Sequence, residues 1–271
     1  MKQQFNNKVV DLLNLKDTKG DVGIEIEMEL QKSNSDPTKF QDSWRLEADG
    51  SLKINGVEFV LKKPVKFEDV PPLIDNLKYN LDASDMKIRP SIRAGIHIHV
   101  NMQQSTMKQV YSMICAYYPM ESALTRFCGN GREGNLFCLR ARDASGVVQT
   151  LETSLEQNDL MYLNTDNLRY AALNVRSLFN YGTLEFRALA TTPELDLIVD
   201  WCSMLQKLKE YSHKLKNNWE PLHSISGDGP RKWMQDVFGP ELFAKLDYPE
   251  LEEDVIKDSR NIQYLVSLTE G

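Results

Sequence analysis

Residues 94–101 read AGIHIHVN, a stretch in which apolar and polar residues alternate. A period of two is typical of a β-strand, whose successive side chains point to opposite faces of the sheet. His97, His99 and Asn101 are therefore expected on one face, with isoleucine and valine on the other. Arg93 has the same parity and would join the polar face of a strand that begins before it.

Two other stretches alternate in the same way. Residues 23–29 read GIEIEME and place three glutamates on one face. Residues 182–188 read GTLEFRA and place Glu185 and Arg187 on one face. If the three strands share a sheet, its polar face carries a histidine pair, a row of carboxylates and a Glu–Arg pair. Carboxylates suit hard divalent cations, histidine suits Mn²⁺ or Zn²⁺, and arginine can stabilise charge on a phosphoryl group.

Each pattern also has an ordinary explanation. A row of carboxylates is often the solvated face of a strand, an H-x-H pair can be hydrogen-bonded in a core, and an exposed Glu–Arg pair contributes little. The glutamate row favours the functional interpretation, because no lysine compensates it and because Gly23 permits a close backbone approach. The remaining histidines, His213 and His223, fall on an expected helix and a following loop.

The composition is that of a globular protein, with 41% hydrophobic and 26% charged residues in a chain of 271. The net charge of −7 disfavours non-specific nucleic-acid binding. No apolar run approaches the roughly 18 residues of a membrane span, and the first residues lack the apolar stretch of a signal peptide. We therefore expect a cytoplasmic protein, and the four cysteines, none in a C-x-x-C pair, fit free thiols in a reducing compartment.

Strand patterns are spread along the chain and mixed with helical ones, which favours an α+β fold with a mostly antiparallel sheet. Residues 105–128 are expected to form one helix, with Glu121 on its apolar stripe, where a carboxylate needs a partner. A strand is expected over residues 170–176. Residues 217–271 should form short helical pieces, and we find neither an internal repeat nor a linker that would divide the chain.

Five motifs follow one another within about residues 22–215, namely GIEIEME, EADGSL with GVEFV, AGIHIHVN, RYAALNV and TLEFRAL. In this order they resemble the amidoligase family, carboxylate–amine ligases with a glutamine-synthetase-like fold that also includes glutamate–cysteine ligases. The resemblance implies a curved, mostly antiparallel sheet with the active site on one face and helices packed on the other. It implies a single catalytic domain over residues 1–271, with a helical extension over about residues 217–271.

The resemblance also implies roles for individual residues. Mg²⁺ or Mn²⁺ would be bound by Glu25, Glu27, Glu58, His99 and Glu185. Catalytic roles would belong to Arg187, Asp49 and Glu27. Contacts with ATP or its phosphates would come from His97, Arg93 and Arg187. Substrate contacts would come from Asn101, Glu121, Arg132 and Asn174. The chain departs from the family pattern at residues 61–64, where the family more often has Ser-Pro, and matches it only loosely at residues 132–138.

Ligases of this kind use ATP to phosphorylate a carboxylate, and an amine then attacks the acyl phosphate. Divalent cations offset the repulsion between the carboxylate and the triphosphate, and an acidic residue takes a proton from the attacking ammonium. The resemblance therefore implies an ATP-dependent ligase that joins a small-molecule or peptide carboxylate to an amine through an amide or isopeptide bond. Two alternatives stay open: a metal-dependent hydrolase, and a non-catalytic binding protein on the same fold. Homo-oligomerisation also stays open.

Overall fold

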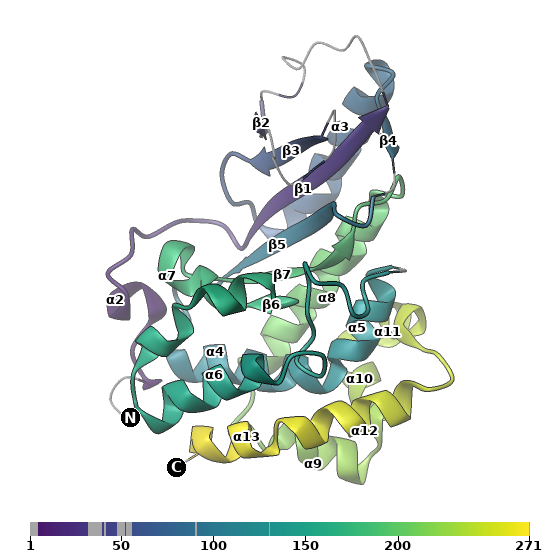
Figure 1. Ribbon diagram of the computed structural model, residues 1–271. Coiled ribbons are helices and arrows are strands. Elements are labelled where there is room, and N and C mark those ends of the chain that lie inside the picture. The colour runs from purple at the N-terminus through teal and green to yellow at the C-terminus, as the bar shows by residue number, and fades with distance from the viewer. Residues whose placement is uncertain are drawn as a thin grey trace.

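The computed structural model describes residues 5–31, 40, 42–47, 52, 56–89, 91–129 and 131–270. In these residues the chain has a mixed α+β fold, with a curved, open sheet of seven strands and helices packed against it (Figure 1). The strands are β1 Val22–Gln31, β2 Trp44–Glu47, β3 Gly56–Leu61, β4 Lys87–Arg89, β5 Gly95–Asn101, β6 Leu173–Asn174 and β7 Thr183–Ala190. Their order is β2-β3-β1-β5-β7-β6, and β4 also pairs with β1. The paired strands run antiparallel, which confirms the expected fold class.

The centre of the sheet consists of β1, β5 and β7, the three strands with alternating sequences. β1 and β5 pair so that Glu25 lies opposite His97, and β5 and β7 pair so that His99 lies opposite Glu185. The alternate residues point to the other face, where Ile98, for example, is completely buried. The alternation of the sequence thus gives the sheet one polar face and one face that belongs to the hydrophobic core.

The α-helices of the described residues are α2 Val9–Leu12, α3 Val70–Ala83, α4 Met107–Tyr117, α5 Glu121–Phe127, α6 Ser145–Glu156, α7 Ser177–Tyr181, α8 Asp196–Ser212, α9 Glu220–Gly227, α10 Pro230–Phe238, α11 Pro240–Leu246, α12 Leu251–Asn261 and α13 Gln263–Glu270. Of these, α3 and α8 pack against each other behind the sheet in Figure 1. Phe186 of β7 meets Tyr117 of α4 and Trp201 of α8 edge to face, so large buried rings anchor the strand that carries Glu185.

The C-terminal helices form a layer at the bottom of Figure 1, and this layer lies away from the sheet. α12 packs against α5, and α13 packs against α4 and α6. An ion-pair network secures α12, because Nη1 of Arg142 lies 2.8 Å from Asp254 and its Nε lies 2.9 Å from Asp258. The prediction of short helical pieces after residue 217 is confirmed.

The expected helix over residues 105–128 is divided. α4 starts after Thr106, whose side chain forms a capping box with Gln109, and a 3₁₀ turn that contains Pro119 separates α4 from α5. Proline has no backbone N–H to donate and its ring crowds the preceding turn, so the helix cannot continue regularly through it.

Two expected strands are shorter than predicted. β5 begins at Gly95, which leaves Arg93 exposed in a bend outside the strand, so the parity argument was wrong for this residue. β6 is only Leu173–Asn174, because a 3₁₀ helix ends at Tyr170 and α7 follows at Ser177. Strand propensity alone does not reveal where tertiary contacts end a ladder.

Among the residues described, we find no helix with both the length and the apolar character needed to cross a bilayer. The four cysteines are buried free thiols.

Candidate metal centre

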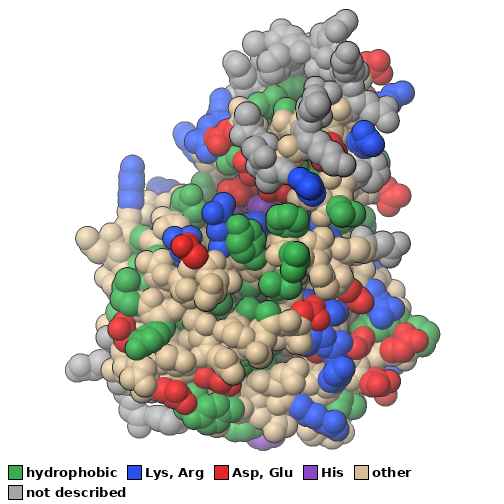
Figure 2. All heavy atoms as spheres, viewed as in Figure 1, with side chains coloured by type: hydrophobic (Ala, Val, Ile, Leu, Met, Phe, Trp, Pro, Cys, Tyr) green, Lys and Arg blue, Asp and Glu red, His purple; other side chains and the backbone are tan. Residues whose placement is uncertain are grey.

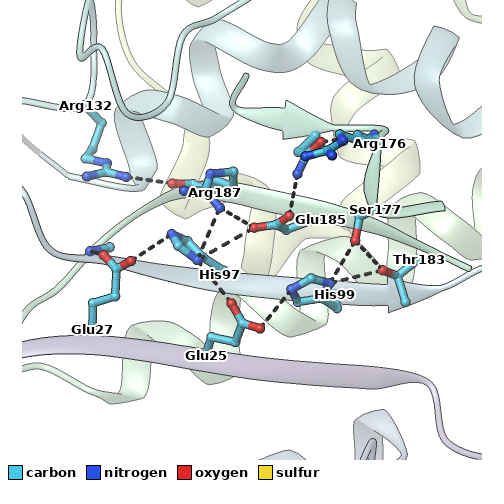
Figure 3. Close-up of polar contacts among 12 residues, drawn as sticks. Glu25, Glu27, His97, His99, Arg132, Arg176, Ser177, Thr183, Glu185 and Arg187 are labelled. Carbon is cyan, nitrogen blue, oxygen red and sulfur yellow. Dashed lines mark hydrogen bonds and ion pairs between the residues drawn. The ribbon is translucent and has the colours of Figure 1, made fainter. Parts of the chain in front are cut away.

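Six of the predicted side chains meet on the polar face of the sheet (Figure 3). They are Glu25 and Glu27 from β1, His97 and His99 from β5, and Glu185 and Arg187 from β7. Figure 2 shows acidic side chains beside a histidine at the surface of this face, with basic side chains around them. The prediction that three separate strands converge on one site is confirmed.

Glu25 lies at the centre of the cluster, between the two histidines. Its Oε2 is 3.4 Å from Nδ1 of His97, and its Oε1 is 3.5 Å from Nε2 of His99. Burial acts to raise the pKa of Glu25, but hydrogen bonds and charge interactions with the two histidines outweigh burial and hold this pKa far below its usual range. Glu25 is therefore ionised, which is the form in which a carboxylate ligates a cation.

His99 is oriented by hydroxyl groups behind it. Its Nδ1 lies 3.0 Å from Oγ1 of Thr183 and 3.2 Å from Oγ of Ser177, and these two hydroxyls are 2.8 Å apart. Its Nε2 is buried and faces Oε1 of Glu25 at 3.5 Å. Burial acts to lower the pKa of His99, but Glu25 and Glu185 outweigh burial and raise it. Hydroxyl partners on one ring nitrogen, with the second nitrogen directed at carboxylates, are an arrangement that suits a metal-ligating histidine.

Glu185 is held from two sides. Its Oε2 accepts a hydrogen bond of 2.6 Å from Nδ2 of Asn174, and its Oε1 accepts one from Nη1 of Arg187. The same Nη1 lies 3.5 Å from Nδ1 of His97. Burial acts to raise the pKa of Glu185, but Arg187 and the histidines outweigh burial and lower it. Each carboxylate oxygen has a second lone pair, so both can still bind a cation.

Two groups of side chains have ligand atoms close enough to share a metal ion. Glu25, His99 and Glu185 form one group, Glu25, Glu58 and His97 form the other, and within each group the atoms lie within 4.8 Å of one another. Carboxylates with imidazole suit Mn²⁺ well and Mg²⁺ less well. The buried Nε2 of His99 supports this fit, because it faces Oε1 of Glu25 and the two atoms could ligate one cation.

Glu27 differs from the other predicted ligands. Its Oε2 accepts a hydrogen bond of 2.8 Å from the backbone N–H of Gly95, and its Oε1 lies 3.8 Å from Nε2 of His97. It belongs to neither ligand group in the described part of the chain, whereas His97, expected to contact phosphate, belongs to one. The start of β5 therefore turns this carboxylate toward the backbone.

The remaining predicted residues are dispersed. Asn174 contacts the cluster through Glu185, and Arg93 is exposed outside β5. The amide of Asn101 donates to the backbone carbonyls of residues 18 and 20 and accepts from residue 103, so it fixes the chain before β1. Asp49 lies outside the described residues.

Glu121 is not part of the cluster. It is 2% exposed in α5, and its Oε2 accepts a hydrogen bond of 2.7 Å from the backbone N–H of Ala141. The apolar stripe correctly indicated a carboxylate that needs a partner, but that partner is a loop amide in the helical layer. Glu121 thus has a structural position away from the polar face of the sheet.

Glu121→Gln should change the pH dependence of stability. Burial raises the pKa of Glu121 from 4.5 to about 8, so its contribution to stability is fully present below pH 4.5 and is lost as the pH rises through about 8. Glutamine stays neutral, so its contribution does not change with pH. As the pH rises through this window, the free energy of unfolding of the variant should increase relative to that of the wild type by about 1.4 kcal/mol per pH unit. Urea unfolding at several pH values between 5 and 9 measures the difference, and the exposed Glu253→Gln is the control. Parallel pH profiles for wild type and Glu121→Gln would contradict the prediction.

A cavity of about 350 Å³ opens beside Glu25 and His99. Its walls combine aliphatic side chains, such as Leu61, with basic ones, such as Arg45. Tyr181 also lines it, and its ring meets that of His99 edge to face at 5.7 Å. A cavity of this size and mixed polarity suits a small molecule held next to the cluster.

The sequence interpretation missed the two hydroxyls behind His99. Thr183 shares its parity with Glu185, so the alternation of β7 could have indicated that it faces the site. Ser177 comes from α7, a short helix that was expected to be strand and turn, and no sequence pattern marked it.

Comparison of the chain with models of protein families and with curated proteins finds no match.

Proposed function

We propose that this protein is an ATP-dependent carboxylate–amine ligase that forms an amide or isopeptide bond through an acyl-phosphate intermediate. One observation carries the proposal. Carboxylates from β1 and β7 flank two histidines of β5, and the guanidinium of Arg187 lies in direct contact with the same cluster. A site that binds a divalent cation, a triphosphate and a carboxylate would need anionic ligands for the metal ion and a fixed positive charge, here that of Arg187, for the phosphoryl group.

Each side chain of the cluster has a distinct part in this proposal. Glu25, His99 and Glu185, together with Glu58 and His97, would hold Mg²⁺ or Mn²⁺, which when bound neutralises charge between the triphosphate and the carboxylate. Arg187 stabilises charge on the phosphoryl group during its transfer.

An acid must also take the proton from the attacking ammonium, because only the free amine is nucleophilic. Glu27 and Asp49 are the candidates. Glu27 lies beside His97 on the polar face, with one oxygen on the backbone of Gly95 and the other turned toward the imidazole.

The cavity beside Glu25 and His99 supports a small-molecule or peptide substrate. We place the reaction in the cytoplasm, because all four cysteines are buried free thiols of the kind that persist in a reducing compartment. The relationship to the amidoligases is part of the proposal and is supported by the order of the five motifs along the chain.

The proposed ligase should release ADP and phosphate only when a carboxylate and an amine are both present. The protein is incubated with ATP, Mn²⁺ or Mg²⁺ and mixtures of amino acids, peptides and amines, and nucleotide products are followed by chromatography while mass spectrometry detects condensation products. Omitting either organic substrate should stop ADP release.

The other outcomes identify the alternatives. Loss of substrate without ATP would indicate a metal-dependent hydrolase, and binding without turnover would indicate a binding protein. Release of AMP and pyrophosphate would contradict the acyl-phosphate route. The hydrolase gains no support from the other histidines, since His213 contacts Ser105 and His223 stacks on Trp219, and neither belongs to a ligand group among the described residues.

A further inference from the structure

The ladder between β5 and β7 contains a β-bulge beside the cluster. Its register moves from Ile98–Phe186 to Ile96–Leu189, so one residue of β5, His97, faces two residues of β7. A bulge interrupts the hydrogen bonds of the ladder and re-aims a side chain, and bulges are common next to active sites. The extra residue lies in the segment that carries Arg187.

Arg132 donates to both residues of the bulge. Its Nη2 lies 2.6 Å from the carbonyl oxygen of Arg187 (Figure 3). Its Nε lies 2.8 Å from the carbonyl oxygen of Ala188. Arg132 is only 3% exposed, so these bonds form away from bulk water. A planar guanidinium presents two N–H groups to two acceptors at once, which a lysine ammonium on a flexible stem does not reproduce.

The contacts hold the main chain at Arg187 from two directions. Its carbonyl accepts from Arg132, and its amide donates to the carbonyl of Ala172 at 2.8 Å. Its side chain is thereby aimed at Glu185 and at His97. Arg132 was expected to contact substrate, but its guanidinium is directed at the backbone of β7.

We propose that Arg132 is a positioning residue that clamps the β-bulge and so aims Arg187 at the phosphoryl-transfer site. The effect on turnover rests on the proposed function, whereas the clamp itself is a property of the sheet. Gly95 makes room for the clamp, because a Cβ atom there would lie 3.1 Å from Nη2 of Arg132 and 3.3 Å from Nε2 of His97.

Arg132→Met tests the clamp, because it keeps an unbranched side chain and removes both donors. It should lower kcat by about 10- to 100-fold, the cost of a small misplacement of a catalytic group, with little change in the KM for ATP. Arg132→Lys, which keeps the charge but not the fork, should recover part of the loss. In the Arg187→Lys background, Arg132→Met should lower kcat by a smaller factor than it does in the wild type, because both changes act through the side chain of residue 187.

Arg140→Met is the matched control. Arg140 is also buried, at 8% exposure, but its ion pairs among the described residues are with Asp143 and Glu133 and not with β7. Its replacement should leave kcat within about threefold of the wild type, as expected of a site that touches no reacting group. Normal turnover in Arg132→Met, or an equal loss in Arg140→Met, would overturn the inference.

Two measurements without ATP separate this inference from the proposed function. Amide hydrogen exchange at residues 187–189 should accelerate in Arg132→Met, while Mn²⁺ affinity measured by calorimetry should stay near that of the wild type. Faster exchange in a protein with no ligase activity would support the clamp and defeat the proposed function. Unchanged exchange in an active ligase would defeat the clamp alone.

Discussion

Arg187→Lys is expected to lower kcat by about 100-fold or more, with a smaller change in ATP affinity. Lysine keeps the positive charge but loses the planar fork that contacts Glu185 and lies 3.5 Å from His97. An interaction that strengthens only as charge develops on the transferring phosphoryl group contributes to kcat and not to ground-state binding. Steady-state kinetics with saturating carboxylate and amine, together with ATP binding by calorimetry, measure both quantities.

Arg176→Lys provides the matched control for this change. Arg176 directly precedes α7, but its guanidinium pairs with Asp166 at 2.9 Å and donates to Asn164 at 3.3 Å, neither of which belongs to the cluster. Its kcat should stay close to that of the wild type. An Arg187→Lys enzyme with normal turnover would remove the phosphoryl role and leave the candidate metal site unaffected.

Glu25→Gln is expected to weaken Mn²⁺ binding by about 100-fold or more. Glu25 is shared by both groups of ligand atoms, so the loss of its charge affects either position, whereas loss of a residue that only supports a ligand typically costs about 10- to 100-fold. Glutamine has nearly the same shape, so the fold should persist. Calorimetric titration with Mn²⁺ measures the affinity, and circular dichroism checks the fold.

Glu27→Gln is the matched comparison, since it makes the same change two residues further along β1. Because Glu27 bonds to the N–H of Gly95 and belongs to neither ligand group among the described residues, its Mn²⁺ affinity should fall by less than about tenfold. Equal losses in the two variants would show that overall negative charge, and not ligation by Glu25, governs cation binding.

The sequence alone determined which side chains share the polar face of the sheet. In a strand the side-chain period is two whatever the neighbouring strands are. Glu25, His97 and Glu185 could therefore each be assigned to the polar face of its strand without knowledge of the pairing. The same local rule predicted that the isoleucines of these strands are buried. The mixture of strand and helical patterns along the chain predicted the α+β class.

The tertiary structure alone decided which of these side chains meet. The order β1-β5-β7 places Glu25 opposite His97, and the start of β5 at Gly95 excludes Arg93. These features depend on hydrogen bonds between segments far apart in the chain, which leave no local periodicity. The bulge at Arg187, where Arg132 donates to the carbonyl oxygen, also depends on strand pairing. A residue of β7 is extra only when β7 is paired with β5, so the sequence of β7 alone does not reveal it.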